Sequence, residues 1–464
     1  MSFDSVMGQT IYPVKSIAVG CDFISGYAFK GKDFTDAGGH PIIKIKNIQD
    51  GKVTIKESQF IPKHLIGKKL EKFKLENGDI LIAMTGQGSV GRVGKLYIST
   101  TTETPYLNQR VGKFVVDEEN LNKEYLYYVL SCKTYENYLF AAGSGSGQPN
   151  LSPALIKAVE IPYPPYKSQC YIGKILSDLD EKIHLNNQIN QTLESIAQAI
   201  FKSWFIDFEP VRAKIAAKQE GNDPELAAMC AISGKSEAEL KQMADDDLAE
   251  LQATAALFPD ELVESELGEV PKGWEVSTIE NCFHVVMGQS PKGETYNENQ
   301  QGKIFFQGRA EFGWRYPSPR LYTTDPKRIA KMNDILLSVR APVGDMNVAL
   351  DECCIGRGLA ALSHKSNHFS YSYYLLKSLK NKFDLFNGEG TVFGSINQKD
   401  LKNITLIEPN RNLIDRFAEL VFIFDQKIKI NSLNISQLID IRDTLLPKLL
   451  SGDVDVSNVK ESLA

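Results

Sequence analysis

The chain has 464 residues, of which 42% are apolar and 24% are charged, and its formal net charge is −6. That balance is typical of a globular protein with room for about three domains. It excludes a membrane protein: no apolar run approaches the roughly 20 residues that a membrane-spanning helix needs, and Met1–Thr10 lacks the pattern of a secretory signal. Seven cysteines without a CxxC pair favour a reducing compartment, so we expect a cytoplasmic protein.

The acidic residues are concentrated in one segment. Residues 219–270 contain 14 acidic residues and two lysines, a net charge of −12, so the rest of the chain carries +6. Mild basicity outside this segment is compatible with contact to phosphates, although many proteins that do not bind nucleic acids share it.

The N-terminal segment, 1–160, reads as strands and short helices. Residues 42–45, 79–84 and 110–116 have strand composition and are bounded by Gly, Asn and Asp, and residues 125–138 have helical spacing. Residues 271–405 pass through a similar series. Asn77-Gly78-Asp79-Ile80-Leu81 is echoed by Met332-Asn333-Asp334-Ile335-Leu336, which indicates a second copy of the same domain.

Each half ends in a segment with the 3.5-residue apolar period of a coiled coil. The first spans about 167–203, and Asp180-Glu181-Lys182-Ile183 in it reappears further along the chain as Asp425-Gln426-Lys427-Ile428. We predict that the two helices pack together as a rigid rod. Pro447 should end or kink the second helix near Leu446. Three polar residues inside the apolar seam would set the helix register, because a buried amide is satisfied in only one alignment: Asn186, Asn190 and Asn431.

Residues 210–270 differ from both halves. Their Ala, Leu, Glu and Asp content predicts short acidic helices in a connector. The plainer interpretation is a solvated spacer, and the alternative is a docking surface for a basic partner. The resulting division of the chain is 1–160 and 271–408 for the repeated domains, 161–209 and 409–464 for the helices, and 210–270 for the connector.

Three motifs resemble chemical sites but do not meet their requirements. Gly86-Gln87-Gly88-Ser89-Val90-Gly91 has the spacing of a dinucleotide loop but is followed by a strand where a helix is needed. Tyr163-Pro164-Pro165-Tyr166 resembles the base-gripping motif of adenine methyltransferases, yet Tyr163 lacks the amide or carboxylate for that role. Cys353-Cys354 with His364 and His368 lacks the knuckle spacing of a zinc site. We therefore expect a binding protein with no catalytic residues and no metal.

The repeat and the helices resemble the specificity subunit of type I restriction-modification systems. The matching segments are Asp180–Asn187, Ala199–Phe208, Ser265–Trp274 and Leu445–Gly452. The Pro-x-Gly-Trp motif that marks the start of a domain, Pro271–Trp274, precedes only the second domain. The resemblance implies an α+β fold in which two similar target-recognition domains are joined by two long antiparallel coiled-coil helices about a pseudo-two-fold axis.

The resemblance also implies a division of labour. Each recognition domain would read one half of a split, asymmetric site in double-stranded DNA. The helices would dock two adenine-N6 methyltransferase subunits, and restriction subunits would add the nuclease and translocase. S-adenosylmethionine, ATP and Mg would be bound by those partners and not by this chain.

Candidate DNA contacts are polar residues in loops of the two domains, because Arg and Lys grip guanine edges and Asn and Gln grip adenine. For any one of them, a phosphate contact or a plain surface role is the competing interpretation. The candidates are Lys44, Lys46, Asn47, Gln87, Arg92, Gln109 and Arg110 in the first domain, and Gln307, Arg309, Arg315, Arg340 and Arg357 in the second. The Ser/Gly segment 143–147 is either a DNA-facing element or a plain connection.

Two other functions stay open from the residues alone. One is a stand-alone DNA methyltransferase, which transfer of a labelled methyl group by the isolated chain would reveal. The other is a coiled-coil scaffold without DNA readout, which salt-dependent binding of duplex DNA by the complex would exclude.

Overall fold

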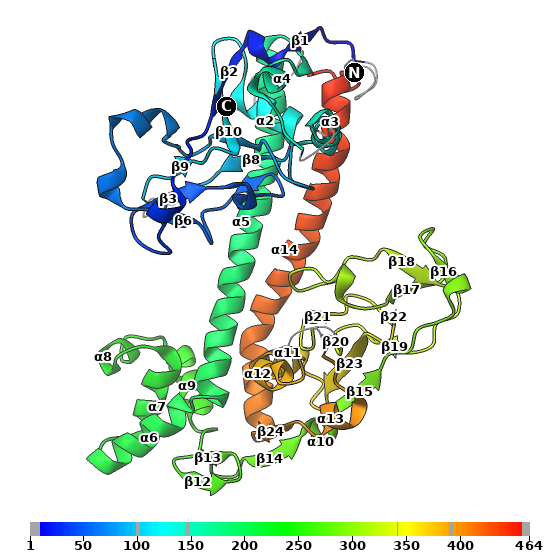
Figure 1. Ribbon diagram of the computed structural model, residues 1–464. Helices are drawn as coiled ribbons and strands as arrows, with labels where there is room; N and C mark the ends of the chain where they lie inside the picture. The colour runs from blue at the N-terminus through cyan, green and yellow to red at the C-terminus, as the bar shows by residue number, and fades with distance from the viewer. Residues whose placement is uncertain (1–9, 99–102, 144–148, 341, 389–393, 457–464) are drawn as a thin grey trace. The chain divides into compact units, whose positions relative to one another are not determined.

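The computed structural model describes residues 10–98, 103–143, 149–340, 342–388 and 394–456. The chain divides into two compact units. Unit 1 comprises Met1–Leu185 with Ile435–Ala464, and unit 2 comprises Asn186–Asn434. Each unit contains one mixed helix-and-sheet domain and part of each of two long helices (Figure 1). Among the described residues, no helix is both long and apolar enough to span a bilayer.

The domain of unit 1 is built on one main sheet. Its strand order is β2 (Cys21–Ser25), β10 (Val111–Val116), β7 (Ile80–Ala83), β8 (Val93–Leu96), β5 (Lys52–Val53) and β4 (Ile48–Gln49). Strand β7 is buried along its whole length, as its unbroken apolar run requires. Smaller sheets pair β6 (Gln59–Ile61) and β9 (Tyr106–Leu107) with β3 (His40–Ile43), and β1 (Val14–Ser16) with β11 (Glu160–Pro162). The helices are α2 (Lys123–Ser131), α3 (Lys133–Gly143) and α4 (Pro153–Lys157).

The domain of unit 2 has the corresponding main sheet in the order β15 (Phe283–Met287), β23 (Leu359–His364), β20 (Ile335–Ser338) and β21 (Met346–Val348). A second sheet has the order β16 (Tyr296–Asn297), β18 (Leu321–Thr323), β17 (Lys303–Phe306), β22 (Cys353–Ile355) and β19 (Ile329–Ala330), and β14 (Glu275–Thr278) pairs with β24 (Thr405–Glu408). The helices are α10 (Ile279–Cys282), α11 (Phe369–Ser378), α12 (Lys380–Asp384) and α13 (Gln398–Lys402).

Strand pairing confirms the internal repeat. The order β2-β10-β7-β8 matches β15-β23-β20-β21. The registers match as well, since Gly112 pairs with Ser25 in the first domain and Ala360 pairs with Met287 in the second. In the second sheet of each domain, one strand runs parallel to its neighbour: β3 with β9, and β17 with β22. The domains differ at the edges, where β4 and β5 extend the main sheet of the first and β19 extends the second sheet of the other.

The two long helices are α5 (Tyr166–Phe205) and α14 (Arg411–Ser451), close to the predicted spans. In unit 2 they pair antiparallel, because Asn190 contacts Asn431 while Phe201 contacts Phe417. The seam that the 3.5-residue period predicts is buried there. The fold is therefore α+β, with two similar domains and a pair of long antiparallel helices.

Of the two outcomes predicted for Pro447, an end and a kink, the end does not occur, because α14 continues to Ser451. Proline removes one helical N–H, but packing outweighs that loss. Leu449 and Leu450 are buried in the core of unit 1. The final carbonyls are also satisfied: Thr10 Oγ1 donates to Leu450 O at 3.0 Å, and Ile11 N donates to Ser451 O at 3.0 Å.

The acidic connector forms short helices, as predicted, and part of it packs against the long helices. It contains α6 (Glu209–Glu220), α7 (Pro224–Ser233), α8 (Glu237–Leu240) and α9 (Asp245–Ala255), followed by a hairpin of β12 (Leu262–Ser265) and β13 (Gly268–Pro271). The ring of Phe258 packs against Trp204 at 5.2 Å. Arg416 of α14 donates to Thr254 at 2.8 Å and pairs with Glu250. The connector is therefore held on the long helices within unit 2.

Candidate nucleic-acid interface

Three loops of the first domain meet at one place. Lys44 follows β3, Gln87 follows β7, and Gln109 with Arg110 follows β9. Because β3 and β9 are parallel neighbours, their ends lie together, and Asn108 N donates to Ile43 O at 3.1 Å. Met84 N donates to Arg110 O at 3.0 Å, which joins the third loop. The side chains of Lys46, Gln87, Gln109 and Arg110 are exposed around this junction.

The second domain repeats this junction. Gln307 follows β17, Arg340 follows β20 and Arg357 follows β22, and all three residues are exposed. Gly356 N donates to Phe306 O at 2.8 Å, and Val339 N donates to Gly358 O at 2.9 Å. Backbone hydrogen bonds thus bring together candidates from segments that are distant in the sequence.

A glycine permits the close approach of the loops in each domain. A Cβ at Gly26 would lie 2.0 Å from the carbonyl oxygen of Asn108, and a Cβ at Gly288 would lie 2.1 Å from that of Gly356. Both distances are far inside van der Waals contact, so a side chain at either position would push the loops apart.

Equivalent positions at the two junctions carry different side chains. The parallel pair Ile43–Leu107 corresponds to the pair Phe306–Ile355. One residue further along the first strand of each pair, Lys44 corresponds to Gln307. Two residues beyond the second strand of each pair, Gln109 corresponds to Arg357. A common backbone therefore presents different hydrogen-bonding groups in the two domains.

Asn47 does not meet the expectation for a DNA contact. Its side chain is 1% exposed, accepts a hydrogen bond from Lys44 N at 2.9 Å and donates to Thr54 O at 2.9 Å. It braces its own loop and has no free edge for a base. Arg315 is also buried, and its guanidinium lies 2.5 Å from a carboxylate oxygen of Asp425. Both predictions are wrong, because a polar residue in a loop segment was assumed to be exposed.

The other ten candidates stay predictions, and some have protein partners. Arg309 pairs with Asp345 at 2.6 Å. The ammonium of Lys44 lies 3.7 Å from the ring centroid of Phe34, and burial together with the charge of Lys46 lowers the pKa of Lys44. Residues 144–147 of the Ser/Gly segment lie outside the described residues.

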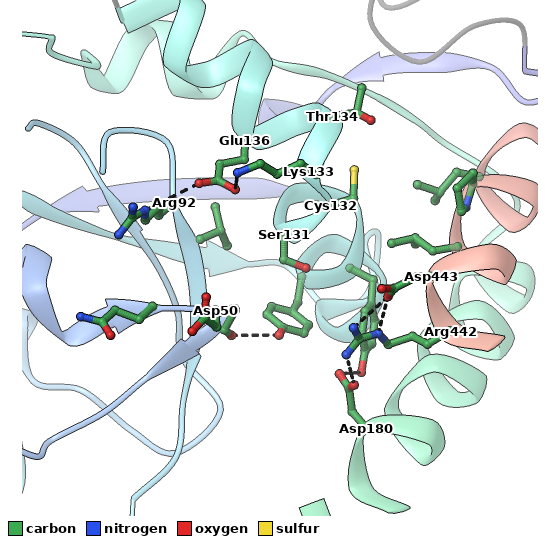
Figure 2. A pocket seen from close by; sticks show the side chains of 18 residues that line it. Asp50, Arg92, Ser131, Cys132, Lys133, Thr134, Glu136, Asp180, Arg442 and Asp443 are labelled. Carbon is green, nitrogen blue, oxygen red and sulfur yellow. Dashed lines mark hydrogen bonds and ion pairs between the residues drawn. The ribbon is translucent and has the colours of Figure 1, made fainter. Parts of the chain in front are cut away.

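Arg92 borders a hollow of about 820 Å³ in unit 1 (Figure 2). The basic side chains that line this hollow form ion pairs with acidic ones. Arg92 and Lys133 contact Glu136, and Arg442 contacts Asp180 and Asp443. Such a mixed lining favours neither an anionic nor a cationic ligand. The glycine-rich turn at Gly86–Gly91 leads into strand β8, as predicted, and not into the helix that a dinucleotide site needs.

One group of potential metal ligands occurs among the described residues, and it differs from the set considered in the sequence. Cys282, His364 and Glu408 place ligand atoms within 4.8 Å of one another. His364 Nδ1 accepts a hydrogen bond from Ser366 N at 3.1 Å, so the proton of a neutral ring is on Nε2, which faces Glu408 at 3.0 Å. Burial raises the pKa of Cys282 to about 11. A protonated ring nitrogen and a neutral thiol support a structural hydrogen-bond cluster.

Comparison with known proteins identifies the family. A model of the type I restriction modification DNA specificity domain matches residues 18–195 and again residues 271–440. The chain belongs to this family. Specificity subunits of type I systems are non-catalytic, so the chain is not an enzyme by itself.

Similar proteins extend over most of the chain. A putative type I restriction enzyme specificity subunit from Methanocaldococcus jannaschii is 29% identical and covers 92% of this chain and 89% of its own. The HindI specificity subunit from Haemophilus influenzae is 32% identical, covering 82% of this chain and 88% of its own. The S subunit from M. genitalium shares the fold, with a TM-score of 0.56 at 17% identity over 95% of this chain and 96% of that one.

Proposed function

We propose that this specificity subunit reads a split DNA site, with each recognition domain contacting one half. The observation that carries the proposal is the pair of equivalent loop junctions with different polar side chains. Lys44 and Gln109 in the first domain stand where Gln307 and Arg357 stand in the second. Two copies of one scaffold with unlike reading groups suit two unlike half-sites.

The distribution of charge supports contact with DNA. Acidic residues are concentrated in the connector, whereas residues 1–150 hold 18 Lys and Arg against 15 Asp and Glu, and residues 271–405 hold 17 against 13. The connector packs on the long helices through Phe258 and Arg416. Because acidic residues are concentrated in the connector, the recognition domains keep a mildly positive net charge, which favours phosphate contacts.

The long helices provide a surface for partner subunits. Outside the buried seam, α14 exposes Phe422, Ile423, Ile430 and Leu433, and Ile423 is 72% exposed. Ile423 and Ile430 are separated by one heptad and so lie on one face. Large apolar side chains grouped on a helix face mark a docking site. We propose that two adenine-N6 methyltransferase subunits dock on the helices, and that these and the restriction subunits bind S-adenosylmethionine, ATP and Mg.

A domain exchange tests the split-site reading. The chain would be produced with its modification subunits in a host without adenine methylation, and modified adenines would be mapped across the genome. We expect one split motif. Replacing residues 1–160 with the first recognition domain of another specificity subunit should change one half of the motif only. A change in both halves would contradict the assignment of one domain to one half.

Copurification tests the docking surface. Ile423→Glu with Ile430→Glu should abolish retention of the modification subunits, because two charges would enter an apolar interface. The matched control is Leu385→Glu, a similar change at an 83% exposed leucine outside the long helices. Retention by the double variant equal to that by the control would overturn this docking surface.

A further inference from the structure

The same carboxylate–tyrosine pair occurs in both units. Asp180 on α5 and Asp425 on α14 are equivalent residues of the repeated Asp-x-Lys-Ile segment. In unit 1, the hydroxyl of Tyr128 on α2 donates to Asp180 at 2.8 Å. In unit 2, the hydroxyl of Tyr374 on α11 donates to Asp425 at 3.2 Å. Each recognition domain is thus tied to a long helix by an equivalent hydrogen bond.

The guanidinium that pairs with the equivalent carboxylate belongs to a different part of the chain in each unit. In unit 1, Arg442 of α14 pairs with Asp180 at 2.8 Å, and both side chains remain partly exposed. The position equivalent to Arg442 in the repeat is Ala197, which has no charge to offer. In unit 2, the guanidinium is supplied by Arg315, which lies between η7 (Arg309–Glu311) and β18 of the recognition domain. Arg315 and Asp425 both have fully buried side chains.

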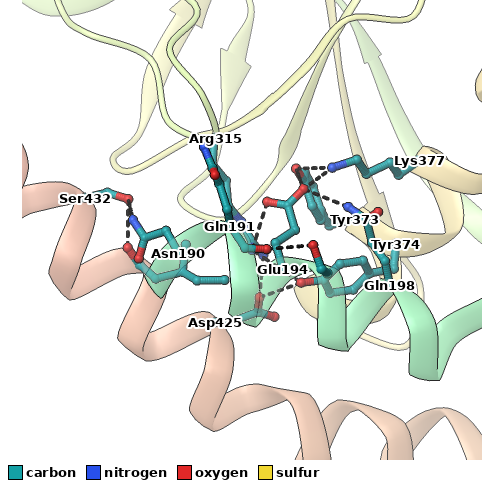
Figure 3. A network of polar contacts seen from close by, with 12 residues as sticks. Asn190, Gln191, Glu194, Gln198, Arg315, Tyr373, Tyr374, Lys377, Asp425 and Ser432 are labelled. Carbon is teal, nitrogen blue, oxygen red and sulfur yellow. Dashed lines mark hydrogen bonds and ion pairs between the residues drawn. The ribbon is translucent and has the colours of Figure 1, made fainter. Parts of the chain in front are cut away.

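The surroundings of Arg315 form a charge network (Figure 3). The guanidinium stacks 4.4 Å from the ring centroid of Tyr373 and lies 3.9 Å from a carboxylate oxygen of Glu194 on α5. Lys377 of α11 pairs with the other oxygen of Glu194. Two cations, the buried Arg315 and the partly exposed Lys377, therefore face two buried carboxylates, and the planar Arg315 fork contacts groups from both long helices.

The loop that carries Arg315 is the one that follows β17 and carries the candidate DNA contacts Gln307 and Arg309. Its backbone is held from the sheet side, because Val348 N donates to Arg315 O at 2.8 Å and Asn347 exchanges two hydrogen bonds with Gly313. The side chain of Arg315 then extends from this loop to α5 and α14. The loop is fixed to the sheet and to the helices at the same residue.

We propose that Arg315 is a positioning residue for sequence recognition, whose buried guanidinium sets the register of residues 307–320 against the long helices. This inference rests on the proposed function for its consequence in DNA reading. In unit 1, both members of the equivalent ion pair belong to the long helices. Weakening Arg315 should therefore affect the half-site read by the second domain and leave the other half unchanged.

The first measurement does not involve DNA. In the complex with modification subunits, Arg315→Lys keeps the charge but loses the planar fork and the stacking on Tyr373. Amide hydrogen exchange of residues 307–320 should become at least ~10-fold faster, while exchange of residues 44–54 in the first domain stays unchanged. The matched control is Arg320→Lys, an exposed arginine of the same loop that pairs with Glu298 and Glu311. Wild-type exchange in Arg315→Lys would overturn the positioning role.

The second measurement is discrimination between half-sites. Methylation of the cognate site would be compared with methylation of sites altered at one base in either half. The half read by the second domain is the one that the exchange of residues 1–160 leaves intact. For Arg315→Lys, discrimination in that half should fall at least ~10-fold, with discrimination in the other half unchanged. An equal loss in both halves would overturn the proposal.

A neutral variant covers the case in which Arg315→Lys does not fold. Arg315→Met with Asp425→Asn removes both charges of the pair and leaves Lys377 to neutralise Glu194. This variant should show the same selective loss, and wild-type discrimination in it would overturn the proposal. If the wild-type complex methylates no split site, the proposed function fails, while hydrogen exchange still decides whether Arg315 positions the loop.

Discussion

The side-chain amide of Asn431 donates a hydrogen bond of 3.0 Å to the side-chain oxygen of Asn190 inside the helix pair of unit 2. Asn190 in turn donates to Ser432 Oγ at 3.2 Å. Both asparagines are buried, so their amides are satisfied only when these two residues face each other. We expect this pair to set the alignment of α5 with α14 at this point, as the sequence predicts for polar residues inside an apolar seam.

Removing both members of this pair should cost less than the sum of the two single removals. Asn431→Ala leaves the Asn190 oxygen buried without its partner. We therefore expect the free energy of unfolding to fall by about 1–3 kcal/mol. Asn190→Leu with Asn431→Leu should cost less than the sum of the single changes, because no polar group is left unpaired. Urea unfolding of the wild type, Asn431→Ala, Asn190→Leu, Asn431→Leu and the double leucine variant measures this, and additive losses of the two leucine changes would argue against coupling.

Asn186 should behave differently. It is buried, but its amide nitrogen has no hydrogen-bond partner among the described residues. Asn186→Leu should therefore leave the urea unfolding midpoint unchanged or raise it, since a buried unpaired amide costs free energy. A loss as large as that of Asn431→Ala would mean that Asn186 also sets the register of the helices.

The glycines at the loop junctions should not tolerate a methyl group. Gly26→Ala and Gly288→Ala each place a carbon about 2 Å from a backbone oxygen, so the loops must separate at a cost of about 1–3 kcal/mol. Gly293→Ala is the matched control, because a Cβ there meets nothing within 4 Å. Thermal unfolding of the three variants tests this. Equal midpoints would show that the junctions are looser than the structure indicates.

Arg340 provides a test of base reading. If its guanidinium contacts a base, Arg340→Ala should weaken binding of the cognate duplex by about 1–3 kcal/mol and leave binding of unrelated duplexes unchanged. Titrations at several salt concentrations separate this result from a phosphate contact, whose loss would weaken all duplexes alike and reduce the salt dependence.

Asp415 should contribute to stability at neutral pH and not in acid. Burial acts to raise the pKa of Asp415, but hydrogen bonds from Arg411 and His368 outweigh it and hold the pKa below its ordinary value. A carboxylate with a folded-state pKa below its unfolded pKa stabilises the protein above the unfolded pKa, and this contribution is lost as the pH falls through the folded pKa.

The thermal midpoint of Asp415→Asn should therefore lie below that of the wild type at pH 7 and approach it as the pH falls below the ordinary pKa of an aspartate. His368→Gln measured at the same pH values separates the contribution of the imidazole from that of Arg411. A gap between wild type and Asp415→Asn that is constant from pH 7 to acid would contradict the assignment.

Features that depend on local patterning were predictable from the amino-acid sequence. The buried run at Ile80–Ala83 forms strand β7, and the 3.5-residue period from Ile172 to Trp204 forms α5. The long-range repeat of the sequence reappears as matching strand order in the two domains. These features follow from which side chains avoid water along a short stretch of chain, and that information is present at every position of the sequence.

Contacts between residues that are far apart in the sequence could be identified only from the tertiary structure. Arg315 lies in a polar loop segment, and nothing near it in the sequence indicates that it meets Asp425, far along the chain, in a buried network. Likewise, α14 passes Pro447 because Leu449 and Leu450 enter a core built largely from the first recognition domain and the start of α5. Hydrophobic periodicity specifies elements, whereas a buried charge or a helix end depends on which distant groups the tertiary fold brings to it.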